Sequence, residues 1–150
     1  YEGRYLAGVA AGLKLNEMIA DGKFKAEEAK IGYVGAYTYA EVISGYTSFY
    51  LGAKSVCPTV TMDVQFTGSW YDETAEKNTA LALINGGCKL ISGHADSMGA
   101  PTACLQRQHR CTVPQHLHRF LQNRLGSLLQ VYLRAGYGRK DHRHRLDRNP

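Results

Sequence analysis

The sequence has 150 residues, the length of one ordinary domain, and is 44% hydrophobic, 21% charged and 10% aromatic. This composition excludes a disordered chain, and no apolar run approaches the ~18–20 residues of a membrane span. The net charge of +5 is unevenly spread: residues 1–104 hold 8 basic and 11 acidic side chains, whereas residues 105–150 hold 10 basic and 2 acidic ones. This asymmetry indicates either a basic nucleic-acid-binding tail or different origins for the two parts.

The first half of the chain is predicted to begin with a helix. Tyr5, Val9 and Leu13 recur at helical spacing, with Leu6 beside them. Gly8 and Gly12 would let this helix approach a neighbour closely. A polar connector over residues 16–30 then leads to a buried strand of the parallel type at residues 31–35, and residues 39–55 have helical periodicity.

Two more strands and two more helices are predicted further along. Residues 60–66 alternate between apolar and polar side chains, which is typical of a strand. Asp72 is a plausible N-cap of a helix that ends at Gly86-Gly87, and a strand at residues 90–92 follows. Ser97 could cap a last helix that runs through Cys104. This alternation predicts an α/β fold with a parallel sheet covered by helices on both faces.

Ligands of such folds bind beyond the carboxyl ends of the strands. Residues 36–41, 67–72 and 93–99 occupy that position and combine aromatic, hydroxyl and carboxylate groups, which suits a polar ring ligand with hydroxyls. Trp70 could stack on a planar ligand or cover the end of the sheet. Asp96 could accept hydrogen bonds from ligand hydroxyls or cap a helix, and His94 could be an acid/base group or a structural histidine.

No catalytic or metal-binding constellation is found in the sequence. It contains neither a G-x-S-x-G motif nor a phosphate loop of the Walker type, so no catalytic residue is expected. The cysteines are too irregularly spaced for a zinc site; Cys57 and Cys88 could form a disulfide in an oxidising compartment or remain buried thiols. The histidine pairs at residues 116–118 and 142–144 could hold a metal only adventitiously, so no cofactor or metal is expected.

Several motifs in these loops and helices occur in the order seen in one family. They are Tyr5-Leu6-Ala7-Gly8, Ile31-Gly32-Tyr33-Val34-Gly35, Glu41-Val42-Ile43-Ser44-Gly45, Leu51-Gly52-Ala53-Lys54-Ser55-Val56, Gly68-Ser69-Trp70-Tyr71-Asp72 and His94-Ala95-Asp96-Ser97. Over residues 1–104 the chain resembles the basic membrane protein family of ABC transporter substrate-binding proteins, the purine-nucleoside-receptor-like lipoproteins. This resemblance implies a solute-binding protein of the type I periplasmic-binding fold, whose two lobes close on a nucleoside.

The resemblance also implies an organisation and a site. Residues 1–30 would end the first lobe and cross over, residues 31–104 would form part of the second lobe, and the opposing aromatic would lie in the absent first lobe. Trp70 falls where the family stacks an aromatic on the purine, and Asp96 and Ser97 fall in the loop beside the ribose. The partners would be a purine nucleoside or a related small molecule and an ABC permease, with no nucleic acid.

The compartment follows from the resemblance and not from a targeting segment. The chain begins at Tyr1, not at Met, so we expect it to be a piece of a longer protein, and the missing signal peptide says nothing about location. The parent protein would lie at the extracellular face of the cell membrane, held by a lipid anchor, or in the periplasm.

Residues 105–150 form a basic, histidine-rich tail that departs from the family, and a shifted reading frame explains it. With suitable codons, a one-base shift turns residues 124–129 into Asp-Trp-Ala-Pro-Tyr-Tyr and residues 145–149 into Asp-Trp-Thr-Gly, both similar to family sequence further along the second lobe. We therefore expect residues 105–150 to be irregular or disordered and no stable part of the fold.

One alternative to a solute-binding protein is a ligand-sensing domain of a transcription regulator with a basic DNA-contacting segment. Another is a small nucleotide-processing enzyme, which would need an acid/base or nucleophile signature that the sequence lacks.

Overall fold

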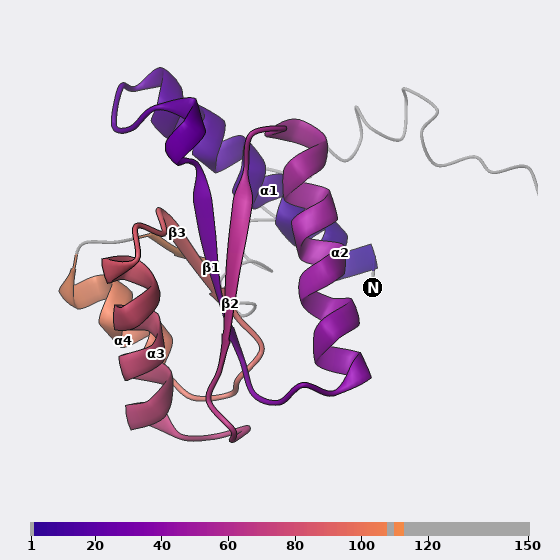
Figure 1. Ribbon diagram of the computed structural model, residues 1–150, viewed down its shortest axis with the longest axis vertical. Helices are drawn as coiled ribbons and strands as arrows, with labels where there is room; N and C mark the ends of the chain where they lie inside the picture. Colours follow the sequence, from indigo (N-terminus) through magenta and orange to yellow (C-terminus); the bar gives the residue numbers. More distant parts are fainter. Residues whose placement is uncertain (1, 108–109, 113–150) are drawn as a thin grey trace, which may run out of the picture. The chain divides into compact units, whose positions relative to one another are not determined.

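The computed structural model describes residues 2–107 and 110–112, in which helices and strands alternate. The elements in chain order are α1 (Glu2–Ala20), the 3-10 helix η1 (Ala26–Glu28), β1 (Lys30–Gly35), α2 (Ala40–Val56), β2 (Thr61–Phe66), α3 (Glu73–Asn85), β3 (Leu90–Gly93), α4 (Gly99–Gln106) and β4 (Arg110–Thr112). The strands form one parallel sheet in the order β2-β1-β3-β4 (Figure 1). The predicted α/β fold with a parallel sheet is confirmed.

Two apolar clusters cover the two faces of this sheet. Helices α1 and α2 pack on one face, where Ile31, Tyr33 and Leu90 are fully buried. Helices α3 and α4 pack on the other, where Val34 and Ile91 are fully buried. Successive residues of β1 are thus buried on opposite faces of the sheet. This is expected for a strand inside a three-layer α/β sandwich, whose sheet lies between the two helix pairs (Figure 1).

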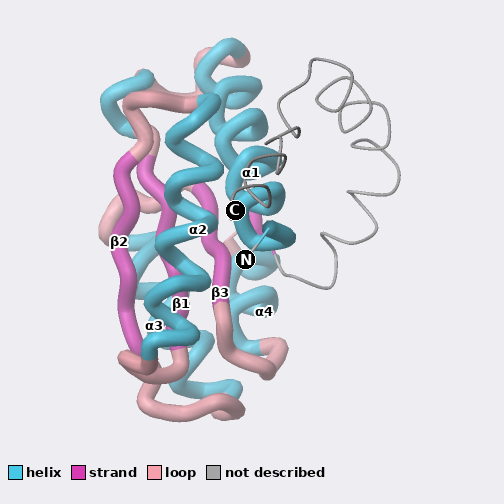
Figure 2. The backbone as a smooth tube through the Cα atoms, turned by 90° about the vertical axis from the view of Figure 1, so that its right-hand side faces the viewer, coloured by secondary structure: helices cyan, strands magenta, loops and turns pink. Residues whose placement is uncertain are grey.

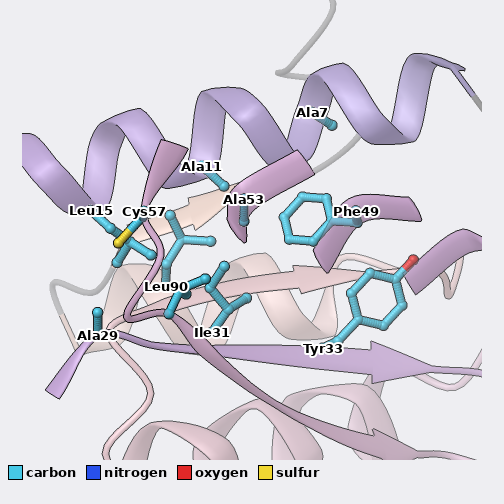
Figure 3. Packing of buried hydrophobic residues seen from close by; sticks show 11 residues of the cluster. Ala7, Ala11, Leu15, Ala29, Ile31, Tyr33, Phe49, Ala53, Cys57 and Leu90 are labelled. Carbon is cyan, nitrogen blue, oxygen red and sulfur yellow. The ribbon is translucent and has the colours of Figure 1, made fainter. Parts of the chain in front are cut away.

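The packing of α1 on α2 depends on small side chains. A Cβ atom on Gly8 would lie 1.9 Å from the carbonyl oxygen of Phe49, and one on Gly52 would lie 2.0 Å from that of Tyr5. The backbones of α1 and α2 therefore lie in close contact, as the glycines of the first helix predicted. Figure 3 shows that Ala7 and Ala11 of α1 face the same cluster as Ala53 of α2.

The helix predicted at the start of the chain is present as α1, but its large apolar residues do not form its buried side. The residues that α1 buries are Ala7, Gly8, Ala10, Ala11, Gly12, Leu15 and Met18. Leu13 is instead 38% exposed, and Tyr5, Leu6 and Val9 are only partly buried. Because close helix contact needs small residues at the interface, the larger side chains are displaced to its flanks.

Helix α1 packs on the sheet within the same compact unit as residues 31–104, and the division of these residues between two lobes stays a prediction. The fold was expected to stop at Cys104, but α4 continues to Gln106, and β4 pairs with β3 as a fourth parallel strand. The expectations for residues 113–150 lie outside the described residues.

The local signals for α3 are confirmed. The side chain of Asp72 accepts a hydrogen bond from the backbone amide of Ala75 at 2.9 Å, which is the predicted N-cap. The helix ends at Asn85, where Gly86 and then Gly87, with φ of +90°, turn the chain toward β3. Within the described part of the chain, no helix has the length and apolar character needed to cross a membrane.

Candidate functional site

Three loops meet at the carboxyl ends of β1, β2 and β3, as the sequence predicted. The amide of Gly68 donates to the carbonyl oxygen of Ala36 at 2.8 Å, which joins the loops after β2 and β1. The amide of His94 donates to the carbonyl oxygen of Val34 at 2.8 Å and continues the pairing of β3 with β1. Figure 2 shows the three loops at the same end of the sheet, so side chains from three separate segments share one surface.

Aromatic rings dominate this surface. Trp70 lies in the loop after β2, with its ring centroid 5.8 Å from Tyr37, 6.4 Å from Tyr39 and 6.0 Å from His94. Tyr37 and Tyr39 stack on each other at 4.9 Å, and Tyr39 is 57% exposed. We name these four side chains the aromatic cluster. Ring contacts of this kind favour particular orientations, and three rings of the cluster contact the indole of Trp70.

Asp96 lies beside this cluster and does not cap a helix. Its backbone amide donates to the carbonyl oxygen of Trp70 at 2.8 Å, and its side chain is exposed. The N-cap of α4 is Met98, so the helix-capping alternative for Asp96 is excluded. The carboxylate remains accessible next to the aromatic cluster, where it can accept hydrogen bonds from hydroxyl groups.

Ser97 is buried and its polar groups are already used within the protein. Its hydroxyl oxygen accepts a hydrogen bond from the amide of Gly99 at 3.1 Å, but the N-cap of α4 is Met98, so the predicted N-cap at Ser97 was one residue too early. Its own amide donates to Oε1 of Glu76 at 3.1 Å. The side chain is 6% exposed, so its hydroxyl supports the loop that carries Asp96.

His94 connects the aromatic cluster to the helices on one face of the sheet. A Cβ atom on Gly45 of α2 would lie 3.0 Å from Nδ1 of His94 and 3.2 Å from Cδ of Arg4, so both side chains lie against Gly45. Nδ1 is buried and has no hydrogen-bond partner among the described residues. Burial, and then the charge of Arg4, lower the pKa of His94, while Glu41 and Asp96 oppose this shift. The lowered pKa favours the neutral imidazole, a form that suits a structural histidine and a general base alike.

Arg4 is a residue of this region that the sequence did not single out. Its Nη1 donates to the hydroxyl of Tyr33 at 2.9 Å and fastens the first turn of α1 to β1. Burial raises the pKa of Tyr33 to about 12, partly offset by the nearby charge of Arg4. Only the contact between distant segments reveals this pair, because an arginine in a first helical turn carries no signal of its own.

The described residues contain no group of three or more histidine, cysteine or acidic side chains that could hold a metal ion. Cys57 is a buried free thiol in the cluster under α1 and α2, whereas Cys88 is buried in the cluster on the opposite face. The sheet separates the two, so they do not bond to each other. The histidine pairs at residues 116–118 and 142–144 lie outside the described residues.

Two curated proteins are similar to most of this part of the chain. One is the purine-binding protein BAB2_0673 of Brucella abortus, 38% identical over 73% of this chain and 27% of its own length. Another, from Haloferax volcanii, has the provisional name ABC transporter glucose-binding protein TsgA13 and is 37% identical over 69% of this chain and 24% of its own. The chain thus spans about a quarter of the length of these relatives.

A solved structure and a family model agree with this likeness. An ABC transporter solute-binding protein from Conexibacter woesei superimposes with a TM-score of 0.56 at 20% identity, over 72% of this chain and 34% of its own, which shows the periplasmic-binding-protein-like fold. The model of the family described as Bmp, ABC transporter substrate-binding protein PnrA-like, matches residues 1–110. The chain therefore belongs to the family of PnrA-like ABC transporter substrate-binding proteins.

Proposed function

We propose that this chain contributes one wall of a purine-nucleoside site in a solute-binding protein that delivers its ligand to an ABC permease. One observation carries the proposal: the loop of Trp70 is hydrogen-bonded to the loop of Asp96, and the indole therefore lies beside an accessible carboxylate. An indole face stacks on a purine, and a carboxylate accepts hydrogen bonds from ribose hydroxyls. The name of the purine-binding relative supports this choice of ligand.

The rest of the site would lie outside this chain. Residues 31–104 would form part of one lobe of the substrate-binding fold, and a second lobe would supply the opposing wall. Capture between two lobes requires only binding groups. We place the complete protein outside the cytoplasm, in the periplasm or anchored at the outer face of the cell membrane, where an importer receives its ligand.

A sugar is the second candidate ligand, because one relative carries the name of a glucose-binding protein. Aromatic faces and carboxylates also suit the apolar faces and the hydroxyl groups of sugars. A purine nucleoside remains the first choice, because the aromatic cluster offers a flat indole supported by two stacked tyrosines.

The test is calorimetry on a two-lobed protein in which residues 1–104 replace the matching segment of the Brucella abortus relative. We expect saturable binding of adenosine or inosine, and no binding of glucose or of free ribose at the same concentrations. Tight binding of glucose without binding of either nucleoside would reject the proposed ligand in favour of a sugar.

A further inference from the structure

Glu76 is an acidic side chain in the interior of the protein. It lies in the first turn of α3 and is 1% exposed. A buried carboxylate is costly unless hydrogen-bond donors surround it. Oε1 accepts a hydrogen bond from the amide of Ser97 at 3.1 Å and a longer one from the amide of Asp72 at 3.5 Å. Two backbone donors, and not another side chain, therefore converge on this oxygen.

These two donors come from the loops that form the candidate site. Asp72 ends the loop that carries Trp70, and Ser97 follows Asp96 directly in the loop after β3. The same two loops are joined a second time where the amide of Asp96 donates to the carbonyl oxygen of Trp70 at 2.8 Å. The two loops are thus connected at two points, at the carboxylate of Glu76 and at the carbonyl oxygen of Trp70.

The start of α4 is held against α3 at the same place. A Cβ atom on Gly99 would lie 2.1 Å from the carbonyl oxygen of Glu73 and 2.9 Å from Cβ of Glu76, so the two helices are in close contact here. The amide of Gly99 donates to the hydroxyl of Ser97, which places Ser97 between the carboxylate and the helix. Because the helices cannot move closer, the carboxylate of Glu76 fixes the position of the loop above them.

We propose that Glu76 is a positioning residue for the ligand site, which sets the distance between the loop of Trp70 and the loop of Asp96. This inference rests on the proposed function only in the identity of the ligand. Without an acceptor at Oε1, the buried amide of Ser97 loses its partner, and an unsatisfied buried amide is expensive enough to make its loop rearrange toward water. Asp96 and the carbonyl contact of Trp70 would then move with that loop.

A pair of variants at Glu76 tests the effect of the hydrogen-bond acceptor separately from the effect of side-chain volume. Glu76→Gln keeps an oxygen at Oε1, whereas Glu76→Met has similar length and no acceptor there. Glu73→Gln is the matched control, because Glu73 lies on the same helix with an exposed side chain. If Glu76→Met fails to fold, Glu76→Asp replaces it, since the shorter side chain keeps the charge but withdraws the acceptor.

The first measurement is amide hydrogen exchange in the 150-residue chain, which needs no ligand. We expect Glu76→Met to accelerate exchange at Ser97 and Asp96 by at least about tenfold, the scale of one lost buried hydrogen bond. Exchange at Ile31 and Val34 in β1 should stay unchanged, and Glu76→Gln and Glu73→Gln should resemble the parent chain. Equal acceleration at every amide, or equal behaviour of the Met and Gln variants, would overturn the positioning role.

The second measurement places the same variants in the two-lobed protein and follows binding of adenosine. Glu76→Met should raise the dissociation constant by at least about tenfold, with Glu76→Gln much closer to the parent. An unchanged dissociation constant for Glu76→Met would overturn the inference. If the parent binds no nucleoside while the exchange result holds, the proposed ligand is wrong and the positioning of the two loops by Glu76 stands.

Discussion

The backbone amide of Asp96 donates a hydrogen bond to the carbonyl oxygen of Trp70 at 2.8 Å. This bond joins two loops that follow different strands, and it brings the chain's single tryptophan next to an exposed carboxylate. The side chains of the two residues remain available, because the contact uses only backbone atoms. A ring-stacking group and an acceptor for hydroxyls are therefore held together by the fold itself.

The chain by itself should not bind nucleosides tightly. Because the proposed second wall is supplied by another lobe, a ligand stacked on Trp70 would remain exposed to water on its other face. Titration of the 150-residue chain with adenosine or inosine, followed through the fluorescence of its one tryptophan, should show no saturable binding in the micromolar range. Saturable micromolar quenching would mean that this chain already contains a complete site.

His94 should make stability depend on pH. Its folded-state pKa is lowered, mainly by burial, so the unfolded chain takes up the proton first, near the ordinary histidine pKa of about 6.5. The contribution of His94 to the free energy of unfolding should be constant above that pH. It should fall as the pH decreases from there toward the lowered pKa of the folded state. Urea unfolding of the parent chain and of His94→Phe, compared at about pH 7.5 and about pH 5.8, measures the difference.

In this comparison His94→Phe keeps a flat ring against Trp70 and removes the titrating group. The loss of stability on acidification should be smaller in the variant. An identical loss in both proteins would show that His94 is not the group responsible, since the other titrating groups are common to both.

The contact between α1 and α2 should be intolerant of a single methyl group. Gly52→Ala would place Cβ 2.0 Å from the carbonyl oxygen of Tyr5, and backbone atoms cannot yield as a flexible side chain can. We expect a loss of about 1–3 kcal/mol in the free energy of unfolding, the range for overpacked interiors. Gly3→Ala is the control, because a Cβ there meets nothing within 4 Å. Equal unfolding midpoints for the two variants would contradict the close packing of the helices.

The fold could be predicted largely from local sequence patterns. The errors lie where contacts between elements determine which residues are buried or which segment forms a strand. The short apolar run of residues 31–35 and the cap at Asp72 identified β1 and α3 correctly. The spacing of the large apolar residues indicated the helix α1 but did not reveal that its buried side consists mostly of glycine and alanine. Strand β4 was missed because its residues, Arg110–Thr112, lack an apolar pattern and are held by pairing with β3.

The site was predictable only in outline. Since carboxyl ends of parallel strands meet at one edge, the three loops could be placed together before the structure was known. The observed start of α4 was required to decide between the two alternatives for Asp96. The role of Arg4 at Tyr33 became evident only from the contact between α1 and β1. Glu76 reads as an ordinary surface charge on a helix until its burial is seen.

The proposed wall of the site is tested most directly by calorimetric titration of adenosine into the two-lobed protein and into its Trp70→Ala variant. Phe24→Ala serves as the control, since this partly buried aromatic packs against the core under α1 and α2 and is not part of the aromatic cluster. We predict that Trp70→Ala weakens binding by about 1–3 kcal/mol, the scale of base–aromatic stacking, while Phe24→Ala leaves it unchanged. A dissociation constant unaffected by Trp70→Ala would contradict the account and leave Trp70 as a cover over the end of the sheet.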